Sequence, residues 1–127
     1  MIQRVEAPSP WVADWAYCRA IRRGQVIEVG GTTAMGADGV VVGSGDPYAQ
    51  AREVLQKVIA AVEELGGSRE DIVRTRVFLR EIDDWREIGR AHRELLADVL
   101  PTSSCIGGLD FLAAEILLEV EATALLG

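Results

Sequence analysis

The sequence is poor in the residues that bind metals. It contains one histidine, His92, and two cysteines, Cys18 and Cys105, which lie far apart in the chain. A zinc site needs several such ligands at short, defined spacings, so no His/Cys metal site is expected. We interpret both cysteines as reduced thiols, as in a cytoplasmic protein, and expect no metal or other cofactor.

Basic residues are also few, with 13 Lys and Arg against 20 Asp and Glu, and the net charge is -7 at pH 7. Binding to phosphates needs a basic face, so nucleic acid is not expected as a partner. The chain has no run of about 18 apolar residues, so no membrane span is predicted. Residues 1–6 also lack the apolar core of a signal peptide. The 127 residues, of which 49% are hydrophobic, predict a single domain over residues 1–127.

Two helices are predicted from apolar residues at helical spacing. The first, over residues 46–65, has Asp46 as its N-cap and Pro47 at its first position. The second, over residues 83–99, has Asp83 as its N-cap and ends before a proline. The helices separate groups of strands, an order typical of an α+β domain with two helices packed on one face of a mixed β-sheet.

The strands are predicted from short or alternating apolar runs. Gly30-Gly31 is expected to end the second of them, and two prolines in residues 7–10 disfavour regular structure before the first. We expect the last two to form a hairpin around Asp110. The predicted strands are residues 17–21, 25–29, 40–42, 72–80, 102–109 and 115–125.

The last predicted strand has an unusual polar face. Alternation places Glu119 and Glu121 on one side, about 7 Å apart, and Leu118 and Val120 on the side that meets the helices. Exposed carboxylates are common, so a solvated outer face is one interpretation. The other is that this face closes against another subunit and leaves a carboxylate beside a cleft, where it can order and activate water. The pattern alone does not decide between them.

Other groups also have two interpretations each. Cys105 is either a nucleophile or, as is usual for a small thiol, a packing residue. His92 falls on the second predicted helix between apolar positions. It is either a residue on the flank of that helix or a general base. Residues 30–33, Gly-Gly-Thr-Thr, can present backbone N–H groups to an anion, but they do not open a helix as a P-loop does.

The aromatic and basic side chains leave further alternatives open. Trp11 and Trp15, followed by Tyr17, could cover a pocket or bury a subunit contact. Four arginines are expected to be solvated, although one or two could bind a carboxylate: Arg22, Arg23, Arg74 and Arg76.

Several segments, in order and with consistent spacing, resemble the YjgF/RidA (Rid) family nearly from end to end. The resemblance implies a chorismate-mutase-like α+β fold that assembles as a homotrimer. It also implies small-molecule ligands in three clefts between subunits. The segments that carry the resemblance are residues 25–32, 46–52, 71–78, 84–92 and 101–105, the last followed by 118–122.

Members of that family with established activity hydrolyse reactive imines and enamines made by pyridoxal-phosphate enzymes, releasing ammonia and a keto acid. In them an arginine after a Pro-Ala or Pro-Thr pair binds the substrate carboxylate. Here that position is Ser103. A hydroxyl cannot replace a bidentate guanidinium, and losing such a contact typically weakens the free energy of binding by several kcal/mol.

The resemblance also assigns site residues. Glu119 matches the water-positioning glutamate, Tyr17 the aromatic that covers the cleft, and Gly31 a backbone site. Two glycines depart from the family pattern. Many relatives have Glu at the position of Gly107, and archetypal members have Asn at the position of Gly89. The implied substrate-binding residues are Tyr17, Gly31, Thr32, Ser103, Ser104, Cys105 and Glu121.

Two functions follow. The first is a cofactor-free hydrolase or related lyase acting on a small imine, enamine or carbonyl compound, and not the standard 2-imino acid deaminase. Its substrate would lack the usual carboxylate or meet it with a different arginine, such as Arg19 or Arg74. The alternative is a non-catalytic trimer whose clefts bind a metabolite or a partner protein.

Overall fold

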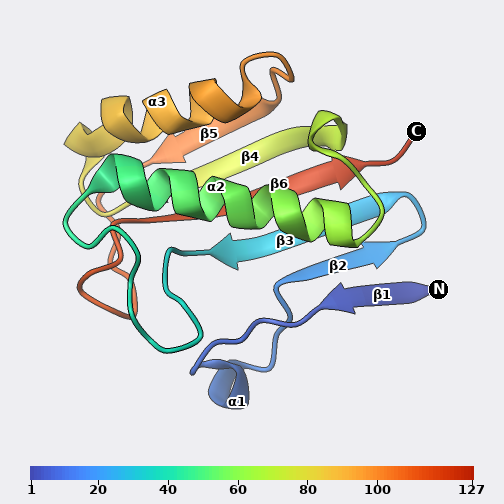
Figure 1. The fold of residues 1–127 in the computed structure, drawn as a ribbon, viewed down its shortest axis with the longest axis horizontal. Helices are drawn as coiled ribbons and strands as arrows, with labels where there is room; N and C mark the ends of the chain where they lie inside the picture. The colour runs from blue at the N-terminus through green and yellow to red at the C-terminus, as the bar shows by residue number, and fades with distance from the viewer.

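A six-stranded mixed β-sheet, covered on one face by two long helices, forms the core of the computed structural model, which describes all residues 1–127 (Figure 1). The strand order is β1-β2-β3-β6-β4-β5. This confirms the predicted α+β class with two helices on one face. The elements are β1 Ile2–Val5, α1 Val12–Trp15, β2 Ala20–Arg23, β3 Val26–Thr32, α2 Pro47–Glu64, β4 Ile72–Leu79, α3 Trp85–Leu96, β5 Thr102–Ile106 and β6 Leu118–Leu125, with 3-10 turns at Arg69–Asp71 and Ile82–Asp84.

Helix α2 forms where the sequence predicts it. Asp46 is the N-cap, and its carboxylate accepts a hydrogen bond from the Ala49 N–H at 3.0 Å. At the other end, the Arg22 guanidinium donates to the Leu65 carbonyl at 2.8 Å, which satisfies a carbonyl that the helix leaves free. The apolar stripe between these ends packs on the sheet and includes Ala51, Val54, Leu55, Val58 and Val62, all buried.

The second helix is shorter than predicted. Residues 82–84 form a 3-10 turn, so Asp83 lies inside that turn and is not the N-cap of a helix. Asp84 holds the N-cap position of α3, but its side chain makes no capping bond. The helix ends at Leu96, and Leu100, at φ 51°, turns the chain out of helical geometry before Pro101.

The predicted C-terminal hairpin is wrong. Strand β5 runs parallel to β4 at the outer edge of the sheet, and β6 lies antiparallel between β3 and β4. The helix between β4 and β5 explains this, because a helical crossover returns the chain parallel to the strand it left. Alternate residues of β6, from Leu118 to Ala124, are fully buried, which suits a central strand. In β5 only Ser104 is even partly covered.

The N-terminal part also differs from the prediction. The second strand of the sheet begins at Ala20 rather than at residue 17, and β3 continues through Gly30-Gly31 instead of ending there. Residues 40–42 form no strand, only an isolated bridge between Met35 and Val41. Strand β1 and helix α1 were not predicted, since short exposed elements carry little apolar periodicity. None of the helices has the length and apolar character that crossing a membrane requires.

Candidate functional site

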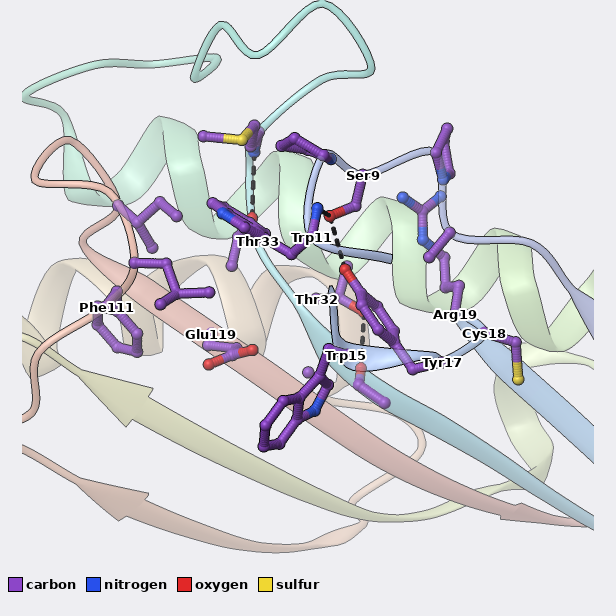
Figure 2. A pocket seen from close by; sticks show the side chains of 18 of the residues that line it. Ser9, Trp11, Trp15, Tyr17, Cys18, Arg19, Thr32, Thr33, Phe111 and Glu119 are labelled. Carbon is purple, nitrogen blue, oxygen red and sulfur yellow. Dashed lines mark hydrogen bonds between the residues drawn. The ribbon is translucent and has the colours of Figure 1, made fainter. Parts of the chain in front are cut away.

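A cavity of about 830 Å³ opens where the N-terminal segment passes over the ends of β3 and β6 (Figure 2). Aromatic side chains form much of its lining, and one of its carboxylates comes from the central strand β6. The cavity lining includes Trp11, Trp15, Tyr17, Gly31, Phe111 and Glu119.

The carboxylate of Glu119 is the most unusual group in the cavity. Its neighbours Leu118 and Val120 are buried against the helices, so strand alternation turns Glu119 to the opposite face. Burial raises the pKa of Glu119, and the nearby charge of Glu121 raises it further. Glu121 differs, because it pairs with Arg76 across the β4–β6 ladder at 3.8 Å and does not line the cavity. Of these two carboxylates, Glu119 is therefore the one without a cationic partner.

A β-bulge at Gly30-Gly31 makes room for Glu119. Val29 pairs with Ala122 and Thr32 with Val120, so two glycines stand opposite one residue of β6. A Cβ atom at Gly31 would lie 2.7 Å from Glu119 Cδ and closer still to Oε1. The glycine pair thus lets the backbone of β3 approach the carboxylate closely, and any side chain at position 31 would displace it.

Short polar contacts fix the N-terminal wall. The Tyr17 hydroxyl donates a hydrogen bond to Ser9 Oγ at 2.6 Å (Figure 2). Ser9 Oγ also accepts a hydrogen bond from the backbone N–H of Trp11 at 3.2 Å. Trp15, on the single turn of α1, is 79% exposed at the mouth of the cavity. Both tryptophans line the cavity, as does Tyr17. An exposed aromatic at a cavity mouth is suited to covering a bound molecule.

Arg80 and Lys57 hold the remaining walls. Arg80, just after β4, donates to the carbonyls of Ile116 at 3.0 Å and Ala113 at 2.9 Å, and its guanidinium lies 5.4 Å from the centre of the Phe111 ring. Lys57 Nζ, on α2, donates to the carbonyls of Thr33 and Met35 at 2.9 and 2.8 Å. Buried stems and charge-assisted bonds of this kind order irregular backbone that has no ladder partners.

The predicted site residues on β5 lie outside the cavity. Ser103, Ser104 and Cys105 do not line the cavity, because β4 separates β5 from β6. The Thr75 hydroxyl, fully buried, donates to Ser103 Oγ at 2.7 Å and lies 2.8 Å from His92 Nε2, so Ser103 points to the helix-covered side. One chain thus brings together Tyr17, Gly31, Thr32 and Glu119, and leaves Ser103, Ser104, Cys105 and Glu121 outside.

The environments of His92 and Cys105 bear on their possible roles. Burial lowers the pKa of His92, which favours a neutral imidazole in contact with Thr75. Partial burial of its side chain raises the pKa of the Cys105 thiol, although the residue as a whole is exposed. A raised pKa disfavours the thiolate, which is the nucleophilic form. No group of three or more His, Cys, Asp or Glu side chains is placed to bind a metal.

Sequence reasoning missed several of the residues that line the cavity, including Ser9, Phe111 and Ile116. Ser9 lies in the proline-containing lead-in segment and Phe111 in the predicted turn around Asp110, whereas Ile116 falls in the predicted strand over residues 115–125 and was given no role in a site. Irregular segments have no apolar period, so position in the chain gave no signal for them. The two prolines around Ser9, which stiffen that segment, were the available hint.

This chain belongs to the Endoribonuclease L-PSP family, whose sequence profile matches residues 7–126. It is 35% identical over 126 residues to the uncharacterized protein SCO2049 of Streptomyces coelicolor, covering 99% of this chain and 93% of the relative. Among solved structures it is similar to Rv2704 of Mycobacterium tuberculosis, a member of the YjgF/YER057c/UK114 family, with a TM-score of 0.88, 30% identity and coverage of 99% and 100%. The YjgF protein of E. coli gives a TM-score of 0.80 at 25% identity, with coverage of 97% and 98%. The resemblance inferred from the sequence is confirmed.

Proposed function

We propose that this protein binds a small molecule in the Glu119 cavity and hydrolyses it without a cofactor, the substrate being a small imine, enamine or related carbonyl compound. The observation that carries this proposal is the environment of Glu119, a desolvated carboxylate with a raised pKa, no cationic partner and an aromatic cavity in front of it. A carboxylate whose pKa is raised toward the working pH is a more effective general base. The net charge of -7 does not favour RNA, although the family description names an endoribonuclease.

In the proposed reaction Glu119 takes a proton from a water molecule as the water oxygen bonds to the imine carbon. The electron pair of the C=N bond moves to nitrogen, which takes up this proton from Glu119, so that a carbinolamine forms and the carboxylate is regenerated. Glu119 then transfers the proton of the new hydroxyl group to the amino group, so that ammonia leaves as the C=O bond forms. One imine and one water give one carbonyl compound and one ammonia.

We further propose that the protein acts as a homotrimer in the cytoplasm. In this assembly the exposed edge strand β5 brings Ser103, Ser104 and Cys105 of one copy toward Glu119 and Tyr17 of the next. Two features support the assembly: the sheet face opposite α2 and α3 carries no long helix, and Arg74 Nε on that face is buried without a hydrogen-bond partner. Light scattering is expected to give three times 13.8 kDa, and a monomer at micromolar concentration would contradict the inter-subunit cleft.

An ammonia-release assay tests the activity. An amino-acid oxidase generates imines in the presence of the wild-type protein or of Ser103→Arg, and the rate of ammonia release is compared with the oxidase alone. We expect the wild type to accelerate release for at least one imine. Turnover by Ser103→Arg alone would instead favour the non-catalytic alternative, a scaffold that binds another ligand. No turnover by either protein would rule out the imine hydrolase.

A further inference from the structure

Arg19 is the only basic side chain that lines the cavity. It is half-buried, and its guanidinium forms no salt bridge and no hydrogen bond within the chain. The other arginines near the cavity are engaged: Arg80 holds backbone carbonyls and Arg76 pairs with Glu121. A half-buried guanidinium without a counter-ion is free to bind an anion that enters the cavity.

Arg19 lies across the glycine bulge from Glu119. The Gly30 N–H donates to the Arg19 carbonyl at 2.8 Å, which places Arg19 next to β3 on the side opposite to β6. Neighbouring strands lie about 4.8 Å apart, so the backbones of Arg19 and Glu119 are separated by roughly 10 Å with the glycines between them. Figure 2 shows the two side chains on opposite sides of Tyr17. The cavity thus has one cationic and one carboxylate end.

The cationic end is not neutralised by the acidic residues of the cavity. Asp110 extends fully into solvent and lies 3.7 Å from Arg80, and Asp14 is exposed on α1. Lys57, whose bonds hold Thr33 and Met35 in the cavity wall, adds a second cation. Desolvation lowers the pKa of Lys57, and the charge of Arg19 lowers it further against the smaller opposing effect of Glu53. Two cations that repel each other will favour an anion beside Arg19.

We propose that Arg19 binds the carboxylate of the ligand and so determines specificity for small organic anions whose electrophilic carbon faces Glu119. The part of this inference that places an electrophilic carbon at Glu119 rests on the proposed function. The part that assigns anion binding to Arg19 does not. It also distinguishes the two arginines suggested by the sequence, because Arg74 lies on β4 outside the cavity. Arg19 thereby supplies a guanidinium within the same chain as Glu119, whereas position 103 is a serine on the edge strand.

Binding of pyruvate and of its uncharged analogue methyl pyruvate tests the proposal. Trp11 and Trp15 line the cavity, so their fluorescence reports occupancy, and calorimetry gives an independent affinity. The variants are Arg19→Gln, Arg19→Lys and Arg23→Gln, the last being a matched control that removes an exposed positive charge from β2, the strand that follows Arg19 directly. Melting curves establish that each variant is folded.

We expect the wild type and Arg23→Gln to bind pyruvate equally and better than methyl pyruvate. Arg19→Gln should bind pyruvate about 10- to 100-fold more weakly, the usual effect of losing a charge-assisted hydrogen bond, and Arg19→Lys should lose less. Equal pyruvate binding by Arg19→Gln and wild type, or no pyruvate binding by the wild type at millimolar concentration, would overturn the proposal. Binding needs no turnover, so Arg19-dependent binding without ammonia release would reject the hydrolase and leave the anion site standing.

Discussion

Glu119→Gln is expected to lower the proposed hydrolysis by about 10²- to 10⁴-fold, the usual contribution of a general base. The amide keeps the size of the side chain and its place beside Gly31, but it cannot accept a proton from water. The measurement is the rate of ammonia release at saturating imine, with binding followed separately. If the variant turns over as fast as the wild type, Glu119 does not activate water.

The same substitution is expected to stabilise the fold at neutral pH. Because the folded-state pKa of Glu119 is raised, its contribution to stability is complete below the unfolded-state pKa, near 4.5, and is lost as the pH rises through the folded-state pKa. Glu119→Gln should therefore have a higher melting temperature than the wild type at pH 7.5, by a few degrees at most, because the carboxylate is partly exposed and solvent screens the effect. The difference should disappear toward pH 4.

Glu28→Gln is the matched control for both effects. Glu28 lies on β3, is exposed and is outside the cavity. We expect this variant to keep its activity and to differ from the wild type by no more than about 0.5 kcal/mol in the free energy of unfolding at both pH values, as is usual for exposed surface substitutions. Stabilisation by Glu119→Gln together with loss of activity would identify a carboxylate that is retained for function at a cost in stability.

The fold could be predicted from the sequence where the signal is local. The Asp46 cap and the apolar stripe after it define α2, and the alternation of Leu118 to Ala124 defines β6. Strand pairing is not local, because periodicity fixes which face of a strand is buried but not which strand lies beside it. That is why β5 and β6 were joined in a hairpin although β4 lies between them.

The candidate site was predictable to the same extent. Residues on regular strands, such as Glu119, could be assigned to a face and then to a role through the family resemblance. The bulge at Gly30-Gly31 could not, since a glycine pair in a strand is read as its end unless the opposite strand is known. The placement of Ser103 against Thr75 and His92 depends on the parallel β4–β5 register, which the sequence does not reveal.

Gln50 connects helix α2 to the cavity wall, although its chemistry has no part in the site. Its side chain is fully buried. Nε2 donates to the carbonyls of Glu115 at 2.9 Å and Gly43 at 3.3 Å, and Oε1 accepts a hydrogen bond from the Leu117 N–H at 3.0 Å. One amide thus satisfies three backbone groups in two loops, including the loop that carries Phe111.

Gln50→Ala is expected to lower the free energy of unfolding by about 2–5 kcal/mol, since it leaves buried backbone groups without partners and opens a void. Gln50→Glu tests the hydrogen-bond explanation against the void, because its carboxylate would face two carbonyls at neutral pH and regain a donor only when protonated. Its loss of stability should therefore diminish as the pH is lowered, unlike that of Gln50→Ala. Urea unfolding measures both variants against Gln56→Ala, an exposed position on the same helix that should change by no more than about 0.5 kcal/mol. If Gln50→Glu is as stable as the wild type at neutral pH, the three bonds do not hold the cavity wall, and weakened ligand binding in Gln50→Ala would need another cause.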